Sequence, residues 1–264
     1  MPVSVSGSVS VVRGTFRPMT LDHLALLSRL QGEFLAAVAD ADPDARVPAC
    51  GDWTVRDLVE HLASIHHWAA GNAYRVKGEP LGDGPFDLAP HYAAQAATLS
   101  RALAELDPSA TARVLTHPEP MGPGPVRFWH RRQAHETLVH LHDLLAARAG
   151  AGSRSLVRAE PEVWADTVDE VVTMFQPRQV GLGRMEPLRF PVVLVATDTA
   201  GAPTWVLGAP GERADEVAPD VVVAGTAEGL ALTLWRRLTP DEAGLTVTGD
   251  RADLEAALAQ PIVP

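Results

Sequence analysis

Two patterns of hydrophobic residues divide the chain near residue 153. In the first half, apolar residues recur at the spacing of amphipathic helices, which place one apolar face against a core. The expected helices span residues 20–41, 54–69, 87–106 and 127–149. Helices of this length joined by loops rich in Gly, Pro and Asp predict a four-helix bundle, in which sites form between facing helices.

Beyond residue 153 the apolar runs become short, with Gly, Pro and Asp turns between them. After a helix at 160–176, this pattern predicts strands at 188–196, 204–207, 221–224 and 245–248, with helices at 225–238 and 251–259. The second half is therefore predicted to be α+β. We expect a flexible segment at 1–18, a helical domain at 19–152 and an α+β domain at 153–264.

The composition is that of an ordinary soluble protein and limits the kinds of binding partner to expect. The 264 residues are 46% hydrophobic and 21% charged, which suits two globular domains. A net charge of −11 argues against general affinity for nucleic acid or anionic membranes. The single cysteine, Cys50, excludes an intramolecular disulfide. With no signal-peptide pattern and no apolar run near the ~18 residues of a membrane span, we expect a cytoplasmic protein.

The helix at 127–149 holds the first candidate site. Glu136 and His140 are four residues apart, so they share one helix face and can coordinate one divalent ion. The same face is formed by Trp129, Arg132, Gln133, Glu136, His140 and Asp143. A polar stripe opposite apolar positions is also typical of a solvated face, so both interpretations stay open. His135 and His142 point away from Glu136.

A third ligand has to come from another helix. Thr54-Val-Arg-Asp57 reads as a capping box that starts the second helix. At the helical period His61 then lies on the border of the apolar stripe, where a histidine needs a partner, either a metal or a hydrogen bond. His23, His66 and His67 are expected on the surface.

Four stretches resemble parts of the mycothiol-dependent maleylpyruvate isomerase family. Residues 53–63, WTVRDLVEHLA, resemble its W-x-V-R-D-L-x-x-H-L-A motif, and residues 132–140, RQAHETLVH, resemble R-x-x-x-E-x-x-x-H. Residues 225–237 and 245–252 resemble its C-terminal domain. The resemblance covers about residues 20–260 and implies an actinobacterial protein with a DinB-like metal-binding four-helix bundle and a smaller α+β domain.

The resemblance also implies a cofactor set. A divalent metal, usually zinc, is expected on His61, Glu136 and His140, with a position left open as in catalytic sites. A thiol entering there would become a thiolate. Mycothiol is the implied thiol cosubstrate, and the implied reaction is cis–trans isomerisation or thiol S-transfer on a small, electrophilic or anionic substrate. Cys50 need not take part.

Two arginines are candidates for the cation that an acidic substrate requires. The family has an arginine in a W-G-R-like element, and the matching residue is Arg237 in Leu-Trp-Arg-Arg, residues 234–237. Arg236 stands where glycine is usual. Arg132, one turn before Glu136, is the second candidate.

Two other functions fit the same residues. A metal-dependent hydrolase would hold water at the open position and would need a base, for which Asp143 is placed one turn after His140. A non-enzymatic protein would instead hold an apolar small molecule among the strand positions of the α+β half.

Overall fold

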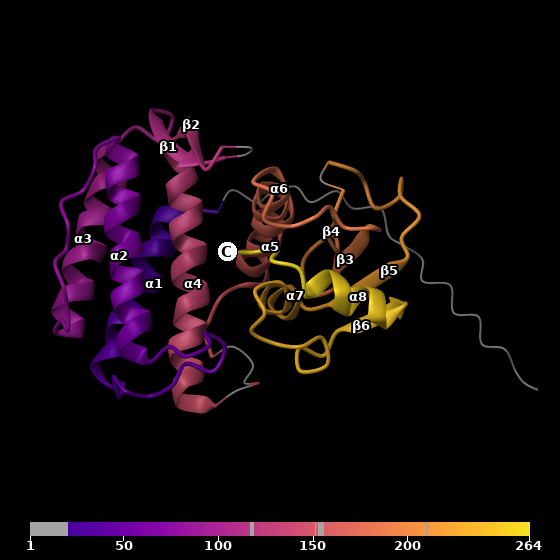
Figure 1. The fold of residues 1–264 in the computed structure, drawn as a ribbon, viewed down its shortest axis with the longest axis horizontal. Helices are drawn as coiled ribbons and strands as arrows, with labels where there is room; N and C mark the ends of the chain where they lie inside the picture. The colour runs from indigo at the N-terminus through magenta and orange to yellow at the C-terminus, as the bar shows by residue number, and fades with distance from the viewer. Residues whose placement is uncertain (1–20, 117–118, 151, 153–155, 210) are drawn as a thin grey trace, which may run out of the picture.

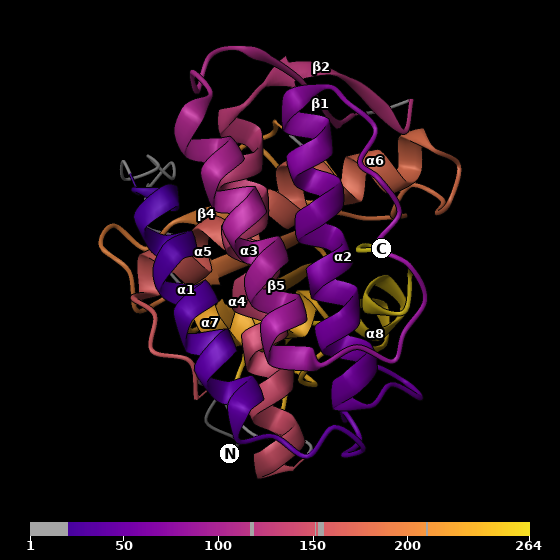
Figure 2. The same cartoon turned by 90° about the vertical axis from the view of Figure 1, so that its left-hand side faces the viewer.

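The first half folds as a helical bundle, as predicted from the sequence. The computed structural model describes residues 21–116, 119–150, 152, 156–209 and 211–264. Its bundle helices are α1 (His23–Ala39), α2 (Val55–Tyr74), α3 (Leu88–Glu105) and α4 (Arg127–Ala149), which run side by side in Figures 1 and 2. The flexible segment expected at 1–18 lies outside the described residues. Residues 153–155 also lie outside the described residues, so the domain boundary that we expect there stays a prediction.

Side-chain caps fix where two of these helices begin. The Asp22 carboxylate accepts a hydrogen bond from the Ala25 amide at 3.0 Å, so α1 starts at His23. The capping box predicted for α2 is present. Asp57 Oδ2 accepts from the Thr54 amide at 2.8 Å, and Thr54 Oγ1 accepts from the Asp57 amide at 3.3 Å. This start sets the phase of α2 and thus the face on which His61 lies.

Helix α4 lies between the rest of the bundle and the α+β half (Figure 1). Its apolar residues Ala134, Leu138 and Leu141 are buried in the core. The opposite stripe is not a solvated face, because α5 and the chain around Arg237 cover it; Arg132, Gln133 and Asp143 are all buried. Polar groups buried on both sides of a helix need partners, and these partners build the site.

A hairpin that the sequence analysis assigned to a loop precedes α4. Strands β1 (Thr111–Leu115) and β2 (Met121–Pro125) pair antiparallel. The run Gly-Pro-Gly-Pro at 122–125 reads as turn residues, which hid the strand. Gly124 is required by close approach, since an added Cβ would lie 2.4 Å from Val114 Cγ2 on the partner strand.

The second half is α+β, as predicted. Its strands form one sheet in the order β4-β3-β5-β6, where β3 and β5 are parallel and the outer pairs are antiparallel. The strands are β3 (Val192–Ala196), β4 (Thr204–Leu207), β5 (Val221–Gly225) and β6 (Thr246–Gly249). The helices are α5 (Pro161–Glu170), α6 (Gln176–Gly181), α7 (Ala227–Leu234) and α8 (Arg251–Leu258).

The helix expected at 160–176 is longer and interrupted. Between α5 and α6 lies a π-helical turn, η1 (Val171–Phe175). Such turns re-aim the side chains that follow them. Helices α5 and α7 stand between α4 and the sheet (Figure 1). Within the described chain we find no helix with the length and apolar character that crossing a lipid bilayer requires.

Candidate metal centre and its pocket

Three side chains from two bundle helices converge where α2 faces α4. Nε2 of His140 lies 3.3 Å from Oε1 of Glu136, and Nε2 of His61 lies 3.7 Å from the same oxygen. Their donor atoms all lie within 4.8 Å of one another. The structure thus brings together the ligand set that the resemblance implied.

These separations fit a shared ion better than hydrogen bonds. Tetrahedral ligands placed about 2.05 Å from zinc stand roughly 3.4 Å from one another. Direct N–H···O bonds would be about 2.7–3.2 Å long. Two imidazoles and one carboxylate are also a donor set that zinc favours. We refer to His61, Glu136 and His140 as the triad.

A carboxylate outside the triad fixes the ring of His140. Its Nδ1 lies 3.0 Å from Asp143 Oδ2, so an Nδ1–H donated there directs Nε2 at Glu136 and His61. A second carboxylate in this position is typical of metal-binding histidines.

Asp143 is in turn held by Arg237. The guanidinium donates from Nε to Oδ1 at 2.9 Å and from Nη2 to Oδ2 at 2.6 Å. Burial alone would raise the pKa of Asp143, but Arg237 and His140 hold that pKa far below its usual value. Asp143 is therefore an ionised positioning group and a poor proton acceptor.

Glu136 is supported by Arg132, which bridges it to Glu170 of α5 through its two terminal nitrogens. Burial raises the pKa of Glu136, and the charge of Arg132, with the nearby His140 and His61 side chains, lowers it to well below the usual value. The Arg132 guanidinium also lies 4.9 Å from the Phe175 ring centroid and 5.4 Å from that of Trp235. Glu136 is thus held ionised, in the form in which a carboxylate can bind a metal ion.

The triad opens into a pocket of about 640 Å³ between the two halves of the chain, which is large enough for a small-molecule ligand. Its aromatic walls are Trp53, Trp68, Trp129, Phe175 and Trp235. Its arginines are Arg132, Arg178, Arg184 and Arg237. Trp53 lies against the His61 ring, with the ring centroids 4.8 Å apart. Arg178 and Arg184 were not predicted as pocket residues, because they follow a π-helical turn that the sequence does not indicate.

The two arginines that were predicted to bind the substrate both line this pocket, but each already forms ion pairs. Arg132 pairs with Glu136 and Glu170, and Arg237 pairs with Asp143. Arg236 has φ 59°, the left-handed region that favours glycine. The backbone at position 236 is therefore one that a glycine would adopt without strain. The Arg236 side chain donates to the carbonyl groups of Ala259 and Gln260.

Cys50 borders the pocket without being activated. Its Sγ lies 3.6 Å from Asp143 Oδ2 and 3.8 Å from Arg237 Nη2. Burial and the charge of Asp143 raise the pKa of this thiol to about 12, against a weaker opposing effect of Arg237. The thiol is neutral at physiological pH.

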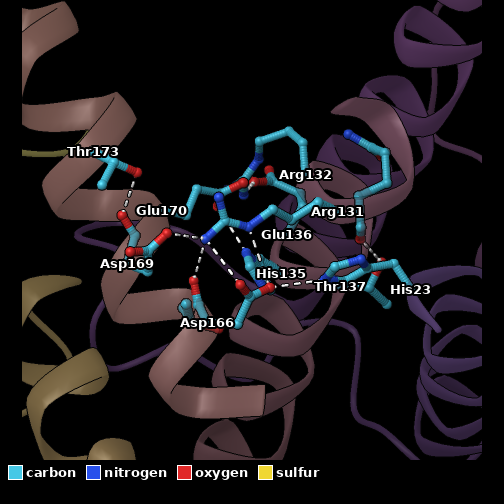
Figure 3. A network of polar contacts seen from close by, with 12 residues as sticks. His23, Arg131, Arg132, His135, Glu136, Thr137, Asp166, Asp169, Glu170 and Thr173 are labelled. Atoms are coloured by element: carbon cyan, nitrogen blue, oxygen red, sulfur yellow. Dashed lines mark hydrogen bonds and ion pairs between the residues drawn. The ribbon is translucent and has the colours of Figure 1, made fainter. Parts of the chain in front are cut away.

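A second cluster of histidines and carboxylates lies on another face of α4. Nε2 of His23 and Nε2 of His135 lie 2.8 and 2.9 Å from Asp166 Oδ2, and Figure 3 shows them in one polar network with Arg131 and Glu170. His135 Nδ1 faces Glu170 Oε2 at 3.0 Å, and Arg131 contacts Asp166 at 3.0 Å. We refer to His23, Arg131, His135, Asp166 and Glu170 as the clamp.

The clamp corrects the sequence analysis in one respect. His23 is not a simple surface residue, because α5 packs Asp166 against it. The signal that could have shown this is Asp166 and Glu170, four residues apart on one helix face.

His66 was also predicted on the surface, wrongly. It is fully buried, with Nδ1 2.8 Å from Gln133 Oε1. Burial lowers the pKa of His66 to about 4, so it is a neutral residue that ties α2 to α4.

Comparison with known protein families confirms the family resemblance seen in the sequence. The profile of the mycothiol maleylpyruvate isomerase N-terminal domain matches residues 24–145, and that of the family's C-terminal domain matches residues 162–256. The chain belongs to the mycothiol maleylpyruvate isomerase family. The two matches together span the triad, the pocket and the segment with Arg237.

Two solved structures of the family share the fold. One is a histidine-to-alanine variant of the mycothiol-dependent maleylpyruvate isomerase, with TM-score 0.58 and 17% identity over 89% of this chain and 96% of that one. The other is the mycothiol-dependent maleylpyruvate isomerase itself, with TM-score 0.55 and 18% identity over 84% of this chain and 91% of that one. A search of curated proteins found no sequence match.

Proposed function

We propose that this chain is a metal-dependent enzyme that uses a low-molecular-weight thiol to act on a small electrophile. The thiol is mycothiol, as in the names of its structural neighbours, and the reaction is cis–trans isomerisation or thiol S-transfer. The observation that supports this most strongly is the triad, whose donor atoms converge at the wall of a pocket shared by both halves. The cytoplasmic location expected from the sequence suits such a reaction.

The triad would hold a divalent ion, zinc being the best match to its donors. Such an ion would lower the pKa of a thiol entering the open position, giving a thiolate at neutral pH. Asp143 keeps the Nε2 lone pair of His140 directed at the triad, and Arg237 keeps Asp143 ionised. We propose that Arg237 is a positioning residue that acts through Asp143. Arg132 does the same for Glu136.

The chain's own cysteine is unsuited to the nucleophilic role. With a thiol pKa raised to about 12, Cys50 is protonated at pH 7, and a protonated thiol is a weak nucleophile. A sulfur nucleophile for this pocket must therefore come from a bound thiol.

The hydrolase alternative is weakened by the same contacts. Asp143, its candidate base, is buried and bound by Arg237 and His140. A carboxylate whose pKa is held this low does not accept a proton at neutral pH.

The binding-protein alternative needs space among the strands of the α+β half. The cavity lined there by Val192, Leu194, Leu207 and Val223 has a volume of about 10 Å³, close to the size of one water molecule. An apolar ligand would not fit.

A thiol-dependence assay tests the proposal. The protein is incubated with maleylpyruvate, with and without mycothiol, and fumarylpyruvate is followed by absorbance; S-conjugates of other electrophiles are followed by mass spectrometry. We expect turnover only with thiol, loss of turnover in His140→Ala, and retained turnover in Cys50→Ser. Thiol-independent turnover, or an inactive but folded Cys50→Ser variant, would contradict the proposal.

A further inference from the structure

The pocket contains more positive charge than the triad requires. Of its four arginines, Arg132 and Arg237 form ion pairs with Glu136, Glu170 and Asp143. Among the residues that the structure describes, neither Arg178 nor Arg184 forms an ion pair, although both line the same pocket. No described side chain compensates this positive charge, and the terminal carboxylate of Pro264, which also lines the pocket, forms no ion pair with either arginine in the described structure.

Arg178 is the more informative of the two because it is buried. Only 6% of its surface is exposed. Nη2 donates to the Pro120 carbonyl at 2.8 Å, while Nε is buried and has no hydrogen-bond partner in the described structure. A buried cation with an unused donor is costly unless a counter-charge binds to it.

The neighbouring charge that acts on Arg178 is positive. Burial first, and then the charge of Arg184, lower the pKa of Arg178. Like charges held together in a pocket repel each other and attract an anion. Arg184 is exposed in the turn after α6, so its long side chain can adjust to a ligand.

The backbone explains why Arg178 lies here. The π-helical turn η1 shifts the register before α6, and α6 then faces the β1–β2 hairpin, to which Arg178 is anchored through Pro120. The hairpin belongs to the helical half and α6 to the α+β half, so both halves form this wall. Fixed at one nitrogen, a guanidinium keeps other donors in a rigid fork suited to a carboxylate.

We propose that Arg178 and Arg184 form an anion subsite that binds a carboxylate of the electrophile in the pocket of the triad. The inference rests on the proposed function and deepens it, because it assigns substrate recognition to residues that none of the sequence motifs contains. Arg237 and Arg132 then support the triad, and Arg178 with Arg184 orients the substrate.

Binding of maleate, used as a small dicarboxylate probe, tests the subsite by isothermal titration calorimetry at low salt. Loss of one charge-assisted contact typically weakens binding about 10- to 100-fold, and we expect this for Arg178→Gln, with a smaller loss in Arg178→Lys. Arg101→Gln, an exposed change on α3, serves as the control and should leave the dissociation constant unchanged. Dimethyl maleate, which has no charge, should not distinguish Arg178→Gln from the wild type.

Whether the two arginines bind the thiol cosubstrate instead is tested in a second arm with mycothiol in place of maleate. The proposal requires that Arg178→Gln leaves mycothiol binding unchanged. Weaker mycothiol binding with unchanged maleate binding would overturn it, and so would maleate binding that is absent from the wild type or insensitive to Arg178. Metal content is measured on the same samples. Maleate binding that depends on Arg178 in a protein unable to hold metal would uphold the subsite and refute the proposed function.

Discussion

The triad and the clamp combine the same kinds of side chain around α4 but differ in spacing. Both join two histidine nitrogens to a carboxylate. In the triad these contacts are 3.3 and 3.7 Å long, while in the clamp they are 2.8 and 2.9 Å. The first pair of distances leaves room for an ion between the groups, and the second is that of direct hydrogen bonds or ion pairs.

Counter-charges make the same distinction. In the clamp, Arg131 Nε donates at 3.2 Å to Asp166 Oδ2, the same oxygen that faces both histidines. In the triad, Arg132 binds one oxygen of Glu136 and leaves Oε1 facing both histidines. Only the triad is among the residues that line the pocket of about 640 Å³. Residue type alone therefore does not identify a metal site; spacing, counter-charge and access decide.

The clamp has a structural role that the triad lacks. Its residues come from α1, α4 and α5, so it ties the bundle to the α+β half (Figure 3). Buried ion networks of this kind are strongly destabilising when one partner is removed. The comparison predicts that the clamp governs stability and the triad governs metal binding.

The largest expected effect comes from the clamp. Asp166→Asn should lower the free energy of unfolding by about 3–5 kcal/mol, because Arg131 and His135 lose a buried counter-charge. Urea denaturation followed by circular dichroism measures this. Asp241→Asn, at an exposed pair with Arg251, should cost less than about 1 kcal/mol. A folded Asp166→Asn variant with wild-type stability would break the comparison.

The next effect concerns the thiol beside the triad. With a pKa raised to about 12, Cys50 should react with iodoacetamide at pH 8 at least about 100-fold more slowly in the folded protein than in urea, where a free thiol has a pKa of about 8.5. The folded rate should rise about tenfold per pH unit, since the thiolate fraction does. Rapid alkylation of folded protein at pH 8 would mean that Cys50 is an activated nucleophile.

A smaller effect tests the support of the triad. Asp143→Asn should fold but bind zinc about 10- to 100-fold more weakly, because His140 loses the carboxylate that orients it. Competition with a chromogenic chelator measures this affinity. Asp169→Asn, beside the clamp, is the matched control and should bind zinc as the wild type does. Equal affinity in both variants would show that Asp143 does not position His140.

The fold and the triad were largely predictable because their signals are local. Glu136 and His140 are four residues apart on one helix, and the capping box at Thr54 sets the phase that presents His61. Local spacing cannot show that His61 meets Glu136; the resemblance supplied that step, and the structure places the two together.

The parts that the sequence analysis missed depend on contacts between distant segments. His23 and Asp166 meet only because α5 packs on the bundle. His66 is buried where α2 packs against α4, and there it is hydrogen-bonded to Gln133. The Gly-Pro-Gly-Pro run hid β2, whose Gly124 is explained by the strand opposite. The π-helical turn that brings Arg178 to the pocket has no periodic signature in the sequence.

Metal stoichiometry tests the contrast between the triad and the clamp most directly. Protein purified without chelator, together with His61→Ala and His23→Ala, is analysed by elemental mass spectrometry. The account predicts about one equivalent of divalent metal in the wild type and in His23→Ala, and none in His61→Ala. A wild type that refuses added zinc, or metal lost in His23→Ala and retained in His61→Ala, would contradict it.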